Sequence, residues 1–204
     1  MRVSSPRRFL FVLWDGGGNV PLQLGLAKGL VERGHDVRVL TEVSLAADVN
    51  AAGCRFEPFV TAPNRASRLE DLVRDSEART PLGAFARARD RVVMGPAAAY
   101  ARDTRAALER EAVDALASDY MLFGPPIAAE RAAVPTAVLV HNVYIVPEPG
   151  KPAPGAGFRP ARSLLGRAHL QTVALASLRS RSTEDLTARC FVLFCFSIAC
   201  ERHQ

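Results

Sequence analysis

Blocks of apolar and polar positions alternate near the N-terminus of the chain. Residues 9–14 form a continuous apolar run, which is typical of a strand buried on both faces of a parallel sheet. An aspartate and three glycines follow at 15–18, and glycines let backbone approach a ligand closely. A helical pattern ends at Gly34, and residues 37–40 give a second buried strand. This unit predicts a helix N-terminus at the carboxyl edge of a sheet, where open α/β folds bind ligands.

The predicted helix carries its own start signals. Asn19 is a suitable N-cap, and Pro21 is acceptable in the first turn, where a missing N–H group costs nothing. Leu22, Leu26 and Leu30 recur every four residues and give the helix one apolar stripe. Such a stripe is the face with which an amphipathic helix ordinarily packs on its core.

The pattern continues as alternating strands and helices. It predicts a helix over 45–52 capped by Ser44, a strand over 54–60, a helix over 81–93, a second helix after Gly95 and Pro96 to about 111, a strand over 113–117, a helix over 125–132 and a strand over 135–140. Short connections between such elements predict an α/β fold with a Rossmann-like, doubly wound parallel sheet. Residues 61–80 are polar and charged, and they form either a mobile loop or a weak helix where a substrate-facing insertion would sit.

The C-terminal part changes character. Residues 147–160 carry proline and glycine at roughly every second position and predict an extended loop, followed by a helix from 163 to about 178. Residues 179–204 form an atypical tail, of which 191–200 are apolar, aromatic and rich in cysteine. This tail is a last buried strand, a stretch translated out of frame, or a segment that touches a partner or a membrane.

Length and charge narrow the possible functions. The 204 residues suffice for one domain with a full core. The net charge of +5 comes from scattered arginines without a basic block, so we expect no nucleic-acid partner. No signal peptide and no apolar run of about 18 residues is visible, so we expect a cytoplasmic protein without an integral membrane segment. The cysteine spacing fits neither a zinc ribbon nor a redox pair.

Four stretches resemble the N-terminal half of GT-B glycosyltransferases, in the family of antibiotic, macrolide and UDP-glucuronosyltransferase-like enzymes. They are FLFVLWDGGGNVPLQLGLAKGLVERGHDVRVL, AAGCRFEPF, SDYMLFG and VPTAVLVHNVY. The resemblance covers residues 7–178 and implies a Rossmann-like acceptor-binding domain, with the C-terminal nucleotide-sugar domain absent from this chain. It further implies transfer of a hexose from a UDP- or dTDP-sugar to a hydroxyl of a small hydrophobic acceptor, with no metal and no other cofactor.

The resemblance also points to the chemistry and to a departure from it. Many relatives carry G-H-x-N-P in the first turn, where the histidine is a general base that a carboxylate on a neighbouring strand orients. Aligning Pro21 with the motif proline places Gly18 at the histidine position, so the base is missing. Asp119 matches the partner carboxylate and is a catalytic candidate. Asp15 and His141 are two further candidates, because all three follow predicted strands and face the same crevice.

Binding candidates surround the same turn and the later strand ends. They are Gly16, Gly17, Gly18, Asn19, Phe123 and Asn142. The three glycines are needed either for backbone geometry or for close approach of an acceptor or of the donor pyrophosphate. Trp14 and Phe123 either line an apolar acceptor pocket or pack in the core, and Asn142 either starts a loop or serves the site.

Two other interpretations remain beside the transferase. In a dinucleotide-binding domain Glu42 would bind the ribose, but the G-x-G-x-x-G fingerprint fails at Pro21. A non-catalytic domain would bind an acceptor alone, or would dock on a separate donor domain or on a second copy of the chain. Loss of the histidine favours this second interpretation, whereas retention of Asp119 favours the enzyme. The transferase interpretation predicts that the isolated chain is inactive.

Overall fold

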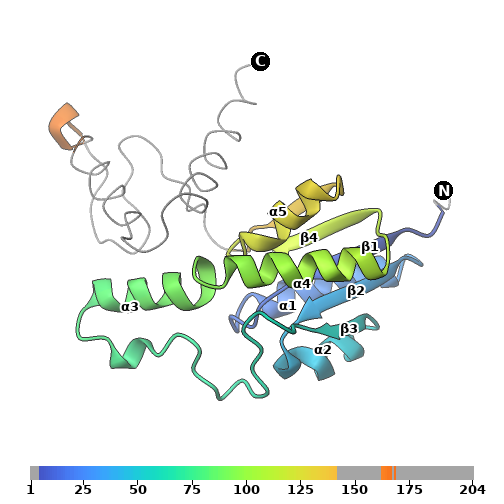
Figure 1. Cartoon of the computed structure of the whole chain (residues 1–204), viewed down its shortest axis with the longest axis horizontal. Coiled ribbons are helices and arrows are strands. Elements are labelled where there is room, and N and C mark those ends of the chain that lie inside the picture. Colours follow the sequence, from blue (N-terminus) through green and yellow to red (C-terminus); the bar gives the residue numbers. More distant parts are fainter. Residues whose placement is uncertain (1–4, 142–161, 167, 169–204) are drawn as a thin grey trace. The chain divides into compact units, whose positions relative to one another are not determined.

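The computed structural model describes residues 5–141, 162–166 and 168 (Figure 1). The chain divides into two compact units, Met1–His141 and Asn142–Gln204. The first unit holds every described strand. In the second unit only a short helical stretch near Gly166 is described, so the expected loop, most of the expected helix and the atypical tail lie outside the described residues.

Five parallel strands form the central sheet, in the order β3-β2-β1-β4-β5. The strands are β1 (Arg8–Val12), β2 (Asp36–Thr41), β3 (Arg55–Pro58), β4 (Ala115–Asp119) and β5 (Thr136–Leu139). Chain order reverses between β1 and β4, which creates the switch point where open α/β folds bind ligands. The predicted Rossmann-like, doubly wound sheet is confirmed.

Helices connect the strands and cover both faces of the sheet. They are α1 (Val20–Val31), η1 (Val43–Leu45), α2 (Ala46–Ala51), η2 (Asp75–Glu77), α3 (Pro81–Ala88), η3 (Arg89–Val93), α4 (Ala97–Arg110) and α5 (Gly124–Arg131). The predicted helix over 81–93 is thus α3 followed by one π-helical turn, and residues 61–80 are irregular apart from η2. No helix in the described part of the chain is long and apolar enough to cross a membrane.

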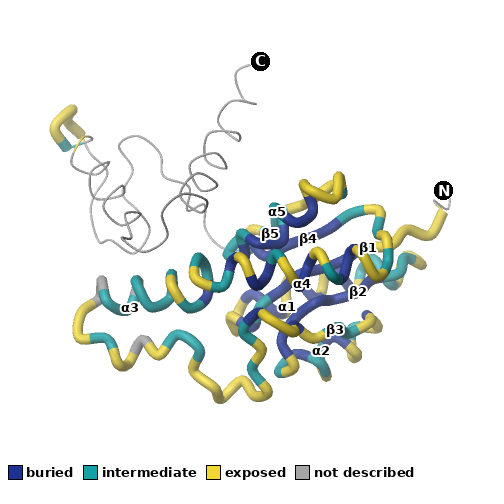
Figure 2. The backbone as a smooth tube through the Cα atoms, in the orientation of Figure 1, coloured by how far each residue is buried: buried dark blue, intermediate teal, exposed yellow. Residues whose placement is uncertain are grey.

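The core consists of two apolar layers, one on each side of the sheet (Figure 2). Successive residues of β1 point to opposite faces, so Leu10 and Val12 pack under α4 and α5, while Phe11 and Leu13 pack under α1 and α2. This burial on both faces explains why the sequence of β1 is a continuous apolar run.

The buried face of α1 differs from the apolar stripe in the sequence. Leu22 and Leu26 are 63% and 49% exposed, whereas Val20, Gln23, Leu24 and Ala27 are buried. The helix is rotated so that Gln23 points inward, where it pairs with a buried carboxylate at the end of β4. Leu22 and Leu26 therefore lie on the outer part of the helix, and of the three leucines only Leu30 packs against the core.

Neither of the two predicted cap residues caps its helix. Asn19 occupies the N-cap position of α1 but makes no side-chain cap hydrogen bond, and its side chain reaches the end of β4 instead. Ser44 lies inside η1, and its hydroxyl donates to Asp15 Oδ2 at 3.2 Å. Both side chains instead donate hydrogen bonds to carboxylates at the carboxyl edge of the sheet.

A buried arginine ties β2 to the end of α4. Arg38 is 2% exposed, and its guanidinium donates to Glu57 Oε1 at 2.6 Å and to the carbonyl oxygen of Glu111 at 2.7 Å. It also donates to the carbonyl of Ala107 at 3.3 Å. The bond to Glu111 satisfies a carbonyl at the C-terminus of the helix, and together these bonds fix α4 on the sheet.

A second polar anchor holds the segment after β3 against α4. The buried carboxylate of Asp103 accepts hydrogen bonds from the backbone N–H groups of Val60, Thr61 and Ala62, all at 2.9–3.0 Å, and from the Thr61 hydroxyl at 2.7 Å. Burial alone would raise the pKa of Asp103, but these hydrogen bonds outweigh burial and hold the pKa below its usual value.

We expect Asp103→Asn to lower the free energy of unfolding by about 1–3 kcal/mol, because the amide leaves buried N–H donors without an acceptor. Since the folded pKa lies below the unfolded one, the carboxylate's stabilisation is complete above about pH 4 and is lost as pH falls through the folded pKa. Urea unfolding from pH 7 downward should therefore show that the difference in the free energy of unfolding between the wild type and Asp103→Asn becomes smaller as the pH falls. Asp90→Asn, which alters an exposed side chain on η3, is the control, and an equal effect there would contradict the assignment.

Candidate functional site

Two polar clusters lie at the carboxyl edge of the sheet. The first centres on Asp119 at the end of β4 and brings together three of the predicted residues, Asp119, Asn19 and His141. The second centres on Asp15, three residues after the end of β1. Asn19 connects them, because its amide nitrogen donates both to the carbonyl of Trp14 at 3.0 Å and to Asp119 Oδ2 at 2.8 Å.

The Asp119 carboxylate is fully buried and accepts three hydrogen bonds. Its Oδ2 accepts from Asn19 Nδ2 at 2.8 Å and from Gln23 Nε2 at 2.5 Å. Its Oδ1 accepts from the backbone N–H of Met121 at 2.9 Å. A buried carboxylate requires such donors, and these bonds join α1 to β4 across the switch point. The catalytic role of Asp119 stays a prediction.

Gln23 belongs to this cluster and was not predicted. It is 2% exposed and lies on the inner face of α1 beside Val20, Leu24 and Ala27. The signal that points to it is the isolated polar residue at helical spacing among apolar ones, because a buried amide needs partners of its own. The Oε1 atom of Gln23 is buried and has no hydrogen-bond partner among the described residues.

His141 follows β5 and approaches the same cluster. Its Nδ1 lies 3.2 Å from Gln23 Nε2 and 3.7 Å from Asp119 Oδ2, so Gln23 is the nearer partner. The ring packs edge-to-face against Tyr120, with centroids 5.0 Å apart. Phe123 is half-buried at the N-cap position of α5, and Asn142 lies outside the described residues, so the roles of these two residues stay predictions.

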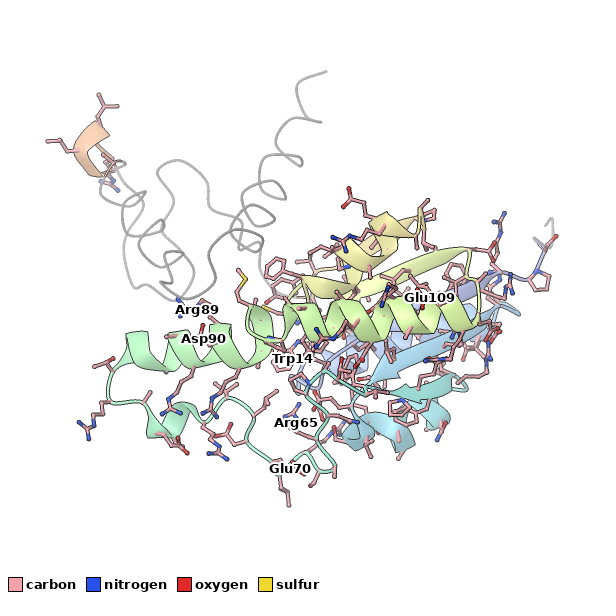
Figure 3. The ribbon with its side chains drawn as sticks, viewed as in Figure 1. Trp14, Arg65, Glu70, Arg89, Asp90 and Glu109 are labelled. Carbon is pink, nitrogen blue, oxygen red and sulfur yellow. The ribbon has the colours of Figure 1, made fainter. Side chains whose placement is uncertain are left out.

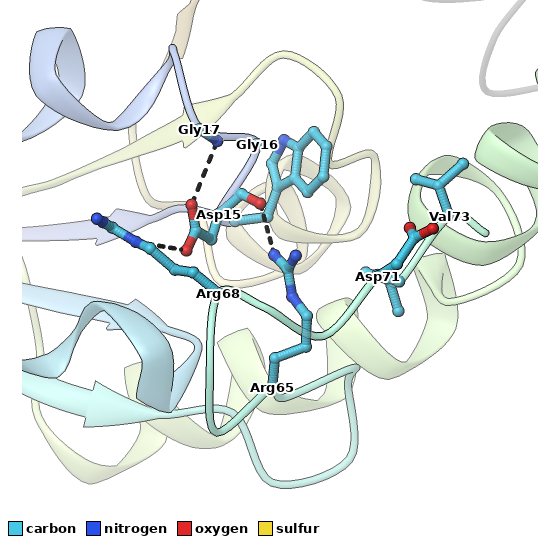
Figure 4. A pocket seen from close by; sticks show the side chains of 9 residues that line it. Asp15, Gly16, Gly17, Arg65, Arg68, Asp71 and Val73 are labelled. Carbon is cyan, nitrogen blue, oxygen red and sulfur yellow. Dashed lines mark hydrogen bonds and ion pairs between the residues drawn. The ribbon is translucent and has the colours of Figure 1, made fainter. Parts of the chain in front are cut away.

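Asp15 is buried and engaged on both carboxylate oxygens (Figure 4). Oδ1 accepts from the N–H of Gly17 at 3.2 Å, and Oδ2 accepts from Arg68 Nε at 2.9 Å and from Ser44. Three donors therefore already engage the Asp15 carboxylate. The role of Asp15 as a base stays a prediction, while its contacts within the glycine turn match the structural alternative.

Glu42, at the end of β2, is fully buried and pairs with Arg65. Its Oε1 accepts from the N–H of Asp15 at 2.9 Å and from Arg65 Nη2 at 2.8 Å, and its Oε2 accepts from Arg65 Nε. Its hydrogen bond raises the pKa of the Arg65 guanidinium. Both carboxylate oxygens of Glu42 are thus occupied, which argues against a ribose-binding role and against the dinucleotide interpretation.

The three glycines differ in what they require. A Cβ at Gly16 would lie 2.8 Å from Trp14 Cζ2, so this position needs glycine for packing. Gly17 has a φ of +78°, which strains any residue with a side chain. Gly18, at the position of the family histidine, is exposed, has no positive φ and has open space around a built Cβ. The backbone therefore does not require glycine at 18.

A cavity of about 300 Å³ opens between the glycine turn and the segment after β3 (Figures 3 and 4). Its lining residues are Trp14, Asp15, Gly16, Gly17, Arg65, Arg68, Asp71, Leu72 and Val73. Arg65 and Arg68 both donate to carboxylates, so neither presents an unpaired cation to the cavity. In the described part of the chain, no three acidic, cysteine or histidine residues are grouped to hold a metal ion.

The three glycines predict a graded response to alanine. Gly17→Ala is expected to cost about 1–2 kcal/mol because of its positive φ, whereas Gly18→Ala is neutral or stabilises by about 0.5 kcal/mol. Gly16→Ala is expected to move the indole, and because Trp14 is the single tryptophan, its emission reports this directly. Urea unfolding and emission spectra measure these effects, and equal losses at 17 and 18 would contradict the assignment.

Arg65→Met is expected to destabilise the protein by about 3 kcal/mol, because it leaves the buried Glu42 carboxylate without its counter-ion. Arg68→Met is the matched control, since Arg68 is 51% exposed and its ion pairs are worth less than about 1 kcal/mol. Glu42→Gln combined with Arg65→Met should recover part of the loss. Thermal unfolding measures all four proteins, and similar losses in both single arginine variants would argue against the buried pair.

We compared the chain with known protein families and with curated proteins. No protein family model matches the chain. The 4'-demethylrebeccamycin synthase of Lentzea aerocolonigenes is 30% identical over 176 residues, which are 85% of this chain and 41% of that protein. The chain therefore spans less than half the length of this curated relative.

Solved structures share the fold. The calicheamicin glycosyltransferase CalG4 matches 96% of this chain and 43% of its own, at 17% identity and a TM-score of 0.56. The glycotransferase of kitacinnamycin matches 66% of this chain and 30% of its own, at 21% identity and a TM-score of 0.51. By its relatedness to this synthase and by its fold, the chain corresponds to the N-terminal half of GT-B glycosyltransferases.

Proposed function

We propose that this chain is the acceptor-binding half of a glycosyltransferase. The enzyme would transfer a hexose from a UDP- or dTDP-sugar to a hydroxyl of a small hydrophobic acceptor, in the cytoplasm. The acceptor oxygen forms a bond to the anomeric carbon, the bond from that carbon to the diphosphate breaks, and the nucleoside diphosphate leaves with the electron pair. The acceptor's proton passes to a base or to solvent.

The observation that carries the proposal is the cavity beside Trp14 at the carboxyl edge of the sheet. Leu72 and Val73 contribute apolar side chains to its wall, and the indole of Trp14 offers a large apolar surface. These surfaces suit a flat or apolar small molecule.

The same cavity is poorly suited to a diphosphate. The N–H groups of Gly16 and Gly17 already donate to Asn19 Oδ1 and to Asp15 Oδ1. The Arg65 and Arg68 guanidiniums are paired with buried or partly buried carboxylates. A phosphate group binds where free N–H donors and unpaired cations converge. The nucleotide sugar is therefore expected to depend on the other half of the enzyme.

Binding of an acceptor is tested with Trp14 as the reporter, since the chain has no second tryptophan. We expect 4-methylumbelliferone, an apolar phenol, to quench Trp14 emission in the full chain, because the indole lines the cavity. Leu72→Arg should weaken this binding about tenfold or more by filling the cavity, a change of about 1.4 kcal/mol. Leu22→Arg, on the exposed face of α1 and outside the cavity lining, should leave it unchanged.

Two results would count against the proposal. One is quenching by UDP-glucose or dTDP-glucose but not by the phenol, which would make the cavity a donor site. The other is equal weakening by both arginine variants. Sugar transfer to 4-methylumbelliferone is followed separately by mass spectrometry with either nucleotide sugar. The purified chain, of verified intact mass, is expected to give no conjugate alone, so donor-dependent transfer would overturn the acceptor-half assignment.

A further inference from the structure

The hydrogen bonds of Gln23 determine which nitrogen of His141 carries a proton. Gln23 Nε2 lies 2.5 Å from Asp119 Oδ2 and 3.2 Å from His141 Nδ1. The carboxylate can only accept, so the group that faces it must be the NH2 of the amide. The opposite amide orientation would set an oxygen against the carboxylate oxygen, where no proton is available to bind them.

An amide NH2 has two protons, and this geometry uses both. One proton goes to Asp119 Oδ2, and the other points to Nδ1 of His141. Nδ1 must then be an acceptor, so a neutral His141 carries its proton on Nε2. Asp119 could impose the opposite tautomer, but its Oδ2 is 3.7 Å from Nδ1, beyond hydrogen-bond distance.

We propose that Gln23 is a positioning residue that holds neutral His141 as its Nε2–H tautomer, so that this ring nitrogen is an N–H donor and not a general base at the carboxyl edge of the sheet. Among residues 5–141 no partner is assigned to Nε2, and the two ring nitrogens point away from each other. That the ligand is an acceptor rests on the proposed function, whereas the tautomer does not.

This arrangement favours one class of acceptor. A general base would need a lone pair on Nε2, and the Gln23 hydrogen bond removes it. Asp119 is fully buried, and Asp15 is occupied by Arg68 and Ser44, so neither is free to take a proton. A phenol-type hydroxyl that ionises readily suits such a site, because an N–H donor stabilises the oxyanion that forms.

The tautomer is measured by nitrogen NMR of the ¹⁵N-labelled full chain, without ligand and at pH 7.5. The His141 signals are those lost in His141→Phe. We expect Nε2 to be the protonated nitrogen, and we expect Gln23→Leu to move the proton to Nδ1, facing Asp119. A wild-type His141 with its proton on Nδ1, or on both nitrogens, would overturn the proposal whatever the outcome of any transfer assay.

The donor role is measured with 4-methylumbelliferone, whose ionised form absorbs differently from the neutral phenol. We expect the bound probe to be the phenolate, and we expect His141→Phe to weaken binding about tenfold, as loss of a hydrogen bond to a charged group does. His141→Gln keeps an N–H donor and should retain most of the affinity. Equal losses in both variants, or a neutral bound phenol, would overturn the donor role. Thermal unfolding of each variant checks that the fold is retained. Gln23→Met is a second variant that removes the amide, in case Gln23→Leu does not fold.

Discussion

The buried carboxylate of Asp119 is the constraint on which the carboxyl edge depends. It ends β4 inside the protein, where an unpaired charge would be prohibitive, so donors must come to it. Asn19 and Gln23 supply them from the start of α1, one helical turn apart. Their bonds fix how α1 is rotated on the sheet. That rotation leaves Leu22 exposed while Gln23 is buried, so the polar contacts, and not the leucines alone, determine which face of the helix packs on the sheet.

In the second cluster, buried carboxylates are again paired, here by arginines. Glu42 and Asp15 are buried where β1 and β2 end, and the segment after β3 brings Arg65 and Arg68 to neutralise them. The largely buried Glu42–Arg65 pair contributes little net stability, but breaking it is costly, so it specifies a conformation, whereas the half-exposed Arg68 contributes less. The conformation they specify is the wall of the cavity that includes Leu72. The cavity therefore depends on charged residues that pair with one another in its wall.

Periodicity and breaker residues predicted the elements of the fold, because both depend on local sequence. The apolar run of β1, the positive φ at Gly34 and the helix before β5 all follow from a few neighbouring residues. The site was predicted only in part. Asp119 and His141 could be expected at strand ends, but the pairing of Gln23 with Asp119 joins residues 96 positions apart, and no local pattern contains it.

The backbone does not require glycine at position 18. A Cβ there would meet no atom within 4 Å, and the φ of this residue is not positive. Asn19 and Gln23 both donate to Oδ2 of Asp119, so amides already engage this oxygen. The carboxylate thus positions amides and, through Gln23, His141. Under the proposed function, a site arranged in this way would orient an acceptor and stabilise negative charge on its oxygen, and removal of the proton would depend on the acidity of the acceptor itself.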